Sequence, residues 1–399
     1  MSLPPLPFQI EAVRSLNRPS LDELRDWHYR EPVLVRGLFE QSSLLAALKS
    51  SRTLDAKLSV LGEHFRDREV DFCVLPPESG GHYLPELVPV LGPGDDVSVR
   101  GVPFSAFAQR LKAAPTTGEY VYMQDGVILP DSRVREALRF DFLQFANPAG
   151  VRSKFWIGSD GQVFNLHYDD FLNFICMFEG TKRVTMFPPE QLPNMSHAPL
   201  DVLCGYAPTT HIQLLKADLE HHPKFRTALE HARVAIVEPG DALVIPPFWW
   251  HHVESFSPLH VMVNNFVTTV PFAAFVEFWK CFSEAIRELA HASQASRVQA
   301  RESFHRAVLG NLDASVDHPL SERARQVARR LSPTWRRHMA RLYDAFVFQV
   351  HGEPFPLAPG GLSGFLERHA RHLTVFPPAN LLAGIPELME LPAGDPRPR

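Results

Sequence analysis

A histidine and an aspartate, His167 and Asp169, stand two residues apart in the stretch F-N-L-H-Y-D-D-F-L-N-F. Because side chains two residues apart in a β-strand point to the same face, a strand here would turn both toward one point. Imidazole and carboxylate together suit a mid-series divalent metal ion. A core histidine beside a solvated aspartate would give the same pattern, so a metal site needs a further ligand.

The sequence W-W-H-H at 249–252 offers that ligand. Two histidines and one carboxylate form the facial ligand set of non-heme Fe(II) oxygenases. His251 and His252 are adjacent, so in a strand they face opposite ways and only one looks inward. The pattern alone does not choose between them.

A lone cation, Lys182, follows Gly180 in the sequence G-T-K-R-V-T-M-F. Most lysines are solvated, but Val184 and Met186 share its face in a strand, which indicates an inward, apolar setting. A buried ammonium needs an anionic partner. The far carboxylate of a dicarboxylate cosubstrate would supply one.

Composition places the chain among ordinary globular proteins. Its 399 residues allow a sizeable core and more than one packed unit, with 45% apolar and 21% charged residues. A formal net charge of −5 gives no argument for binding nucleic acid or an anionic membrane. Four scattered cysteines form no C-x-x-C pair and favour a reduced protein: Cys73, Cys176, Cys204 and Cys281.

The N-terminus has no basic segment followed by an apolar one, and no stretch approaches the roughly 20 apolar residues of a membrane span. We therefore expect a cytoplasmic protein with no membrane partner. An arginine-rich run at 323–341 is the one basic feature, and a solvated helix face explains it, so we do not expect a nucleic-acid partner.

From residue 155 to about 270 the sequence has the pattern of short β-strands bounded by Gly, Pro and Asp. Gly180 is expected to form a hairpin turn between two of them. Short strands with few intervening helices predict a mainly β fold with some α, whose core is a double-stranded β-helix, the jelly roll of cupin barrels. The eight expected strands are 155–158, 163–168, 173–178, 183–187, 233–237, 241–245, 249–255 and 260–267.

Mixed N-terminal α/β elements precede this core. We predict a first domain at 1–270, with its barrel core at about 120–270. The polar piece 190–232 is too long for a plain turn and predicts a functional insertion. Before the barrel, the sequence predicts a helix that begins at the capping box 20–23 and further helices at 42–50 and 103–111. It also predicts strands at 31–37 and 119–124.

Beyond residue 270 the apolar period becomes helical, which predicts a helical C-terminal region at 271–390 and a disordered tail at 391–399. The large apolar residues of these helices either cover one sheet of the barrel or pair two subunits, and we expect a homodimer formed through them. The helices are expected at 271–292, 321–331, 334–350 and 361–373.

Two motifs resemble the JmjC, or cupin-like, Fe(II)- and 2-oxoglutarate-dependent oxygenases. They are H-Y-D-D-F-L-N-F-I-C-M-F-E-G-T-K-R-V-T-M-F-P-P at 167–189 and P-G-D-A-L-V-I-P-P-F-W-W-H-H-V-E-S at 239–255. The resemblance covers about 20–270, and within the family the sequence is similar to the asparaginyl hydroxylase of hypoxia-inducible factor. It implies His167, Asp169 and His251 as Fe(II) ligands, which leaves His252 as a residue that supports the ligands or as a structural residue.

The resemblance also implies a cosubstrate pocket. Lys182 and Tyr122 would hold the C5 carboxylate of 2-oxoglutarate, and Asn173 and Asn265 would line the pocket. The sequence departs from the family at Phe164, where a relative has a hydroxyl-bearing residue that contacts 2-oxoglutarate. One cosubstrate hydrogen bond is therefore in question.

The reaction implied by the resemblance consumes 2-oxoglutarate and O₂, releases succinate and CO₂, and hydroxylates an amino-acid residue of a protein or peptide. Gln124 and Trp249 would contact that substrate. The alternatives are an N-methyl demethylase of the same fold, a hydroxylase of a small molecule or RNA, and a metal-binding cupin without turnover. An intact ligand set together with Lys182 argues against the last.

Overall fold

The computed structural model describes residues 3–26, 30–65, 69–82, 98–128, 133–138, 151–169, 171–196, 209–210, 212–267, 293–309, 329 and 333–348. The chain separates into two compact units. The first consists of Met1–Ala198 with Ala207–Thr268, and the second of Pro199–Tyr206 with Thr269–Arg399.

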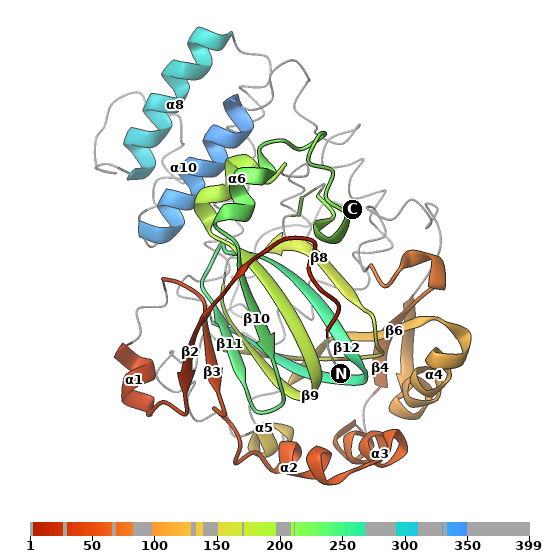
Figure 1. Ribbon diagram of the computed structural model, residues 1–399. Helices are drawn as coiled ribbons and strands as arrows, with labels where there is room; N and C mark the ends of the chain where they lie inside the picture. The colour runs from red at the N-terminus through yellow and green to blue at the C-terminus, as the bar shows by residue number, and fades with distance from the viewer. Residues whose placement is uncertain are drawn as a thin grey trace, which may run out of the picture. The chain divides into compact units, whose positions relative to one another are not determined.

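In the first unit, a 12-stranded sheet folds over on itself, so that two halves face each other across an apolar interior (Figure 1). One half has the order β2-β3-β11-β9-β12-β7-β6-β4-β5, and the other joins β1, β10 and β8 to the far ends of β9 and β12. The predicted jelly-roll fold is confirmed. The strands are β1 Glu11–Ala12, β2 Arg14–Asn17, β3 Val33–Arg36, β4 Glu69–Leu75, β5 Ser98–Pro103, β6 Tyr120–Ile128, β7 Val151–Gly158, β8 Val163–Tyr168, β9 Leu172–Phe187, β10 Arg233–Val237, β11 Ala242–Ile245 and β12 Trp250–Val267.

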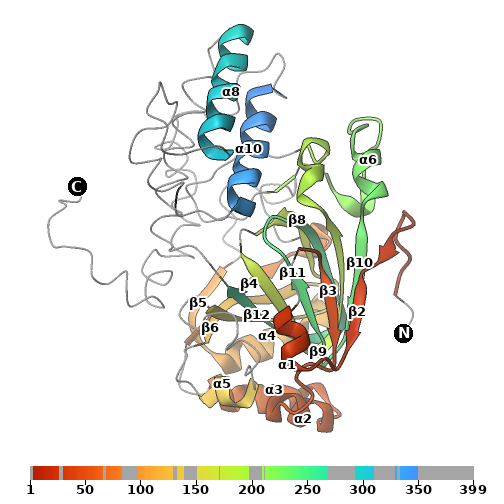
Figure 2. The same ribbon diagram turned by 90° about the vertical axis from the view of Figure 1, so that its left-hand side faces the viewer.

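Side-chain alternation along these strands separates two apolar clusters. In the first half of β9, Ile175 and Met177 point into the interior, where they meet Val184 and Val253 from the facing half. Neighbouring residues such as Phe174 point the other way, toward a layer of helices that covers the larger half of the sheet (Figure 2). The helices of the first unit are α1 Leu21–Asp26, α2 Ser43–Ser50, α3 Leu54–Phe65, α4 Phe104–Thr117, α5 Arg133–Leu138 and α6 Phe225–Glu230.

The hairpin predicted at Gly180 is wrong. Strand β9 is continuous from Leu172 to Phe187, and it pairs with β12 along both of its halves rather than folding back on itself. Gly180 has φ +77° and marks the bend at which both strands pass from one half of the sheet to the other. A Cβ at this position would lie 2.7 Å from the carbonyl oxygen of Leu259. Glycine therefore permits the bend.

The described part of the predicted insertion at 190–232 includes short helical segments: the 3₁₀ turn Pro189–Asn194, which begins one residue before it, the 3₁₀ turn Leu214–Lys216 and the helix α6. Phe225 of α6 packs against Phe187 at the end of β9, with ring centroids 5.5 Å apart. The insertion also reaches the free edge of β8, where Thr209 pairs with His167 and the Thr210 N–H bonds the Leu166 carbonyl at 3.2 Å. It thereby covers the strand that carries the His-x-Asp motif.

The described part of the second unit includes α8 (Gln294–Leu309) and α10 (Pro333–Phe348), which lie side by side (Figures 1 and 2). Asp344 accepts hydrogen bonds from Arg301 and His305, each at 2.8 Å from its Oδ1. Helix α10 matches the helix expected at 334–350, whereas α8 was not predicted. The other expected helices and the tail at 391–399 lie outside the described residues. None of the described helices is long and apolar enough to cross a membrane.

We expect Gly180→Ala to lower the free energy of unfolding by at least about 2 kcal/mol. The alanine would have to adopt a left-handed backbone conformation, and its Cβ would clash with the carbonyl oxygen of Leu259. Gly62→Ala in α3 is the matched control. Its Cβ would make only ordinary contact with Phe104 at 3.6 Å, so it should raise stability by up to about 1 kcal/mol. Urea unfolding measures both, and equal effects of the two substitutions would contradict the role of the bend.

Candidate metal centre

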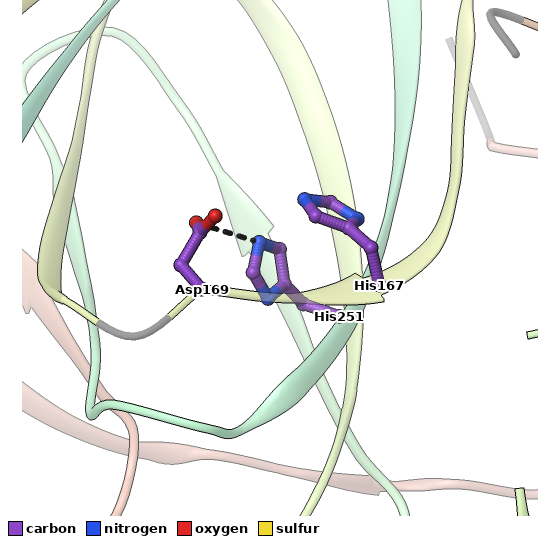
Figure 3. Close-up of side chains that lie close together, drawn as sticks. All are labelled: His167, Asp169 and His251. Carbon is purple, nitrogen blue, oxygen red and sulfur yellow. Dashed lines mark ion pairs between the residues drawn. The ribbon is translucent and has the colours of Figure 1, made fainter. Parts of the chain in front are cut away.

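Three side chains converge in the interior at one end of the barrel. His167 and Asp169 come from β8 and the residue just beyond it, and His251 comes from β12 (Figure 3). One ligand atom of each lies within 4.8 Å of the others. The two imidazole rings are 4.0 Å apart, and His251 Nε2 is 3.5 Å from Asp169 Oδ2. Among the described residues this is the group able to hold a metal ion.

Backbone hydrogen bonds fix the proton positions of both histidines. His167 Nδ1 lies 2.7 Å from the carbonyl oxygen of Asn165, and His251 Nδ1 lies 3.0 Å from that of Trp249. Because a carbonyl only accepts, each Nδ1 carries the hydrogen and each Nε2 keeps a lone pair. This is the outer-shell arrangement of metal-ligating histidines. The donor set therefore fits a divalent metal.

Electrostatics favour the protonation states that metal binding requires. Burial, reinforced by the neighbouring His251, lowers the pKa of His167 to about 3, so this imidazole is neutral. Burial raises the pKa of Asp169, but the neighbouring imidazoles of His251 and His167 and a hydrogen bond from the amide of Asn173 outweigh it and leave the pKa below its usual value. Asn173 Nδ2 donates to Asp169 Oδ2 at 3.2 Å.

The adjacent His252 points to the outer face of the sheet, so His251 is the histidine that joins the pair. His252 is opposite Thr185 in the register of β9 and β12, and it is 1% exposed. Its Nδ1 lies 4.0 Å from Glu254, which forms two hydrogen bonds with the buried Arg183 at 2.7 and 2.6 Å.

A strained backbone residue ties the two ends of the metal site together. Phe248 has φ +70°, an unusual value for a bulky side chain, and it is fully buried. Its N–H donates to the carbonyl oxygen of Asp169 at 2.7 Å. Such strain persists only where surrounding structure imposes it. Here it holds the turn before β12 against the end of β8.

Lys182 lies on the same interior face, 1% exposed. Its Nζ donates a hydrogen bond of 2.7 Å to Ser255 Oγ and lies 5.7 Å from the centre of the Tyr122 ring. No carboxylate of the described chain pairs with it. Burial lowers the pKa of Lys182 to about 7 and raises the pKa of Tyr122, so the phenol remains protonated. The ammonium is therefore set to receive an anion.

Two buried polar residues that the sequence analysis missed adjoin this cation. His260 Nε2 lies 2.6 Å from Gln162 Oε1, and the His260 ring meets Tyr122 edge-on at 5.4 Å. Burial and the charge of Lys182 hold the pKa of His260 well below its usual value. A Cβ at Gly158 would come within 2.8 Å of Tyr122, so glycine allows this close packing. In the sequence, the signal for His260 was its position as a polar residue inside the apolar run L-H-V-M-V at 259–263.

The prediction that Asn265 lines the cosubstrate pocket is not supported by its orientation. Its Oδ1 accepts from Ser153 at 2.6 Å and its Nδ2 lies 3.6 Å from Cys176 Sγ, on the face covered by helices. Asn264 faces the interior instead, beside Ile175. The physical reason is a pair of register shifts in β12 between residues 256 and 262, which change the phase of alternation.

The two expected substrate contacts have different outcomes. Trp249 is buried, and its Nε1–H donates to the carbonyl oxygen of Arg30 at 3.3 Å, so this group supports the fold. Its apolar ring packs with the interior cluster. Gln124 belongs to β6, and its side chain lies outside the described structure.

Comparison with curated proteins finds partial relatives. HSPB1-associated protein 1 from Homo sapiens is 33% identical over 126 residues, 31% of this chain and 25% of that protein. Jumonji C domain-containing protein 5 from Drosophila melanogaster is 32% identical over 111 residues, which are 28% of this chain and 26% of that protein. Lysine-specific demethylase JMJ31 from Arabidopsis thaliana is 28% identical over 122 residues, which are 29% of this chain and 22% of that protein. These matches span about a quarter of each relative's length.

A family profile gives the broader assignment. The profile described as "Cupin-like domain" matches residues 27–271, more than half of the chain. The matched range contains strands β3 to β12, the three converging side chains and Lys182. The chain belongs to the cupin-like domain family.

Proposed function

We propose that the protein is an Fe(II)- and 2-oxoglutarate-dependent oxygenase that hydroxylates an amino-acid residue of a protein or peptide. One observation carries the proposal: a two-histidine, one-carboxylate group and a buried lysine without a carboxylate partner in the described structure share one barrel interior. Relatives named for the Jumonji C domain support it.

His167, Asp169 and His251 would hold Fe(II), which with 2-oxoglutarate and O₂ supplies oxidative decarboxylation coupled to hydroxylation of a C–H bond. Lys182, with Ser255 as its hydrogen-bond partner, binds the distal carboxylate of the cosubstrate. The apolar interior excludes water around both groups.

The substrate class is inferred from the motifs and the relatives. A protein or peptide target follows from the resemblance of the two site motifs to protein hydroxylases. The relative named a lysine-specific demethylase favours a second candidate, an N-methyl demethylase with the same ligand set. The two differ in product, because hydroxylation of an N-methyl group releases formaldehyde.

We expect purified protein supplied with Fe(II), 2-oxoglutarate and O₂ to form succinate, at a low uncoupled rate when no substrate is present. Mass spectrometry of succinate measures this, and a peptide library then separates a gain of one oxygen from loss of a methyl group with formaldehyde. Absence of succinate, with and without peptides, would contradict the oxygenase assignment and favour a cupin without turnover.

We expect His251→Asn to weaken Fe(II) binding by more than about 100-fold, since loss of a ligand should exceed the effect of losing an outer-shell partner. His252→Asn is the matched control, because His252 lies next in sequence but faces away from the site. Anaerobic titration with Fe(II) measures both. Equal losses in the two variants would show that the ligand set is misassigned.

We expect the affinity for 2-oxoglutarate to fall as pH rises above about 7, where the buried Lys182 of the free protein loses its proton. Below that pH the ammonium is already present. Above it, binding must take up a proton, so affinity falls by up to about tenfold per pH unit. His260 stays neutral throughout because its pKa is well below the usual value.

Calorimetry in buffers of different ionisation enthalpy counts the protons taken up. Lys182→Met is the control, for which binding should be weaker and independent of pH. Binding that is independent of pH in the unmodified protein would contradict the role of Lys182.

A further inference from the structure

Several buried polar atoms on the interior face have no hydrogen-bond partner among the described residues. Leaving a buried donor or acceptor unmet is unfavourable, and native proteins rarely do so without a functional reason. These atoms belong to strands β7, β9 and β12, which also border the metal centre and Lys182. They are Trp156 Nε1, Asn173 Oδ1, His260 Nδ1 and Asn264 Oδ1.

Three of these atoms are acceptors. The amide nitrogen of Asn173 already donates to Asp169, which leaves its carbonyl oxygen. The amide nitrogen of Gln162 donates to the Val121 carbonyl at 2.5 Å, so its oxygen accepts from His260 Nε2–H and His260 Nδ1 keeps a lone pair.

Asn264 Oδ1 is an acceptor by its chemistry. The indole N–H of Trp156 is therefore the single donor of the four.

Trp156 also stands between the two ends of the proposed site. Its ring contacts Tyr122 at 5.9 Å, and Tyr122 is the ring that faces Lys182. On its other side it meets Phe164 edge-on at 6.2 Å, and Phe164 contacts the metal-site residue His167 at 4.5 Å. Ring contacts therefore run from Tyr122, beside Lys182, through Trp156 and Phe164 to His167.

We propose that the indole N–H of Trp156 donates a hydrogen bond to 2-oxoglutarate and replaces the hydroxyl that Phe164 does not provide. The inference rests on the proposed function and adds a specific cosubstrate contact to it. The ionised cosubstrate has oxygen acceptors only, so it matches the unpaired donor and none of the three acceptors. A donor facing a carboxylate belongs to the stronger class of hydrogen bonds.

The test is a binding cycle with Mn(II)-loaded full-length protein under nitrogen, measured by calorimetry with 2-oxoglutarate. Trp156→Phe should raise the Kd by about 10- to 100-fold, the range of a hydrogen bond to a charged group. Adding Phe164→Thr to the Trp156→Phe variant should then lower the Kd for 2-oxoglutarate by at least about fivefold. The same substitution should lower the Kd by less when Trp156 is present. Met262→Leu, the cross-strand neighbour of Trp156, changes packing without removing a donor and should leave the Kd within about twofold.

Equal affinity of Trp156→Phe and the unmodified protein would overturn the inference while leaving the proposed function intact. Equal gains from Phe164→Thr in both backgrounds would overturn the claim that one group replaces the other. If the unmodified protein does not bind 2-oxoglutarate at all, the proposed function fails and takes the inference with it.

A second measurement covers the case in which Trp156→Phe does not fold. The chain has six tryptophans, whose ¹⁵N-labelled indole resonances can be followed in the Zn(II)-loaded protein. Adding 2-oxoglutarate should shift one indole proton downfield, and Phe164→Thr should reduce that shift. Unchanged indole resonances on saturation with 2-oxoglutarate would overturn the inference.

Discussion

The pairing of β9 with β12 in both halves of the sheet sets the positions of Lys182 and His251. The two strands pair from Leu172 opposite Val267 to Phe187 opposite Trp250, with register shifts where they cross the bend between the halves. Their register sets Lys182 directly opposite Ser255. Slipping one strand by a single residue would turn the lysine to the outer face and separate it from its partner. The proposed contact between Lys182 and the cosubstrate thus depends on strand register.

The two faces of the same strand pair treat charge in opposite ways. On the outer face, Arg183 is neutralised by two hydrogen bonds to Glu254, an arrangement complete within the chain. On the inner face, Lys182 has a neutral hydroxyl partner, Ser255. A buried pair needs nothing further, whereas a buried lone ammonium is stabilised by an added anion. The contrast distinguishes a structural ion pair from a binding group, although Lys182 and Arg183 are adjacent in sequence.

Local sequence rules and the family resemblance predicted the three side chains that the structure brings together at the candidate metal centre, and most strands of the barrel core. The spacing of His167 and Asp169 needs only two-residue alternation, and the W-W-H-H sequence narrowed the third ligand to two candidates. The resemblance implied Asn265 at the pocket, but the register shifts in β12 turn Asn264 inward instead, and nothing in V-N-N-F shows this. The bend at Gly180 was mistaken for a hairpin because a glycine with positive φ serves both purposes. Helix α3 was not among the predicted helices. The Trp156 contacts depend on four strands and have no local signal.

The order of the ligands along the chain has a consequence for biosynthesis. His167 and Asp169 leave the ribosome with β8, whereas His251 arrives with β12, after the whole insertion and strands β10 and β11. Strand β12 is also the hydrogen-bonded partner of both β8 and β9, so neither strand is fully paired before it appears. Contacts of such long sequence separation form late, at a cost in loop-closure entropy. The nascent chain therefore emerges with its first two ligands exposed, and it gains a complete metal site when its last barrel strand docks.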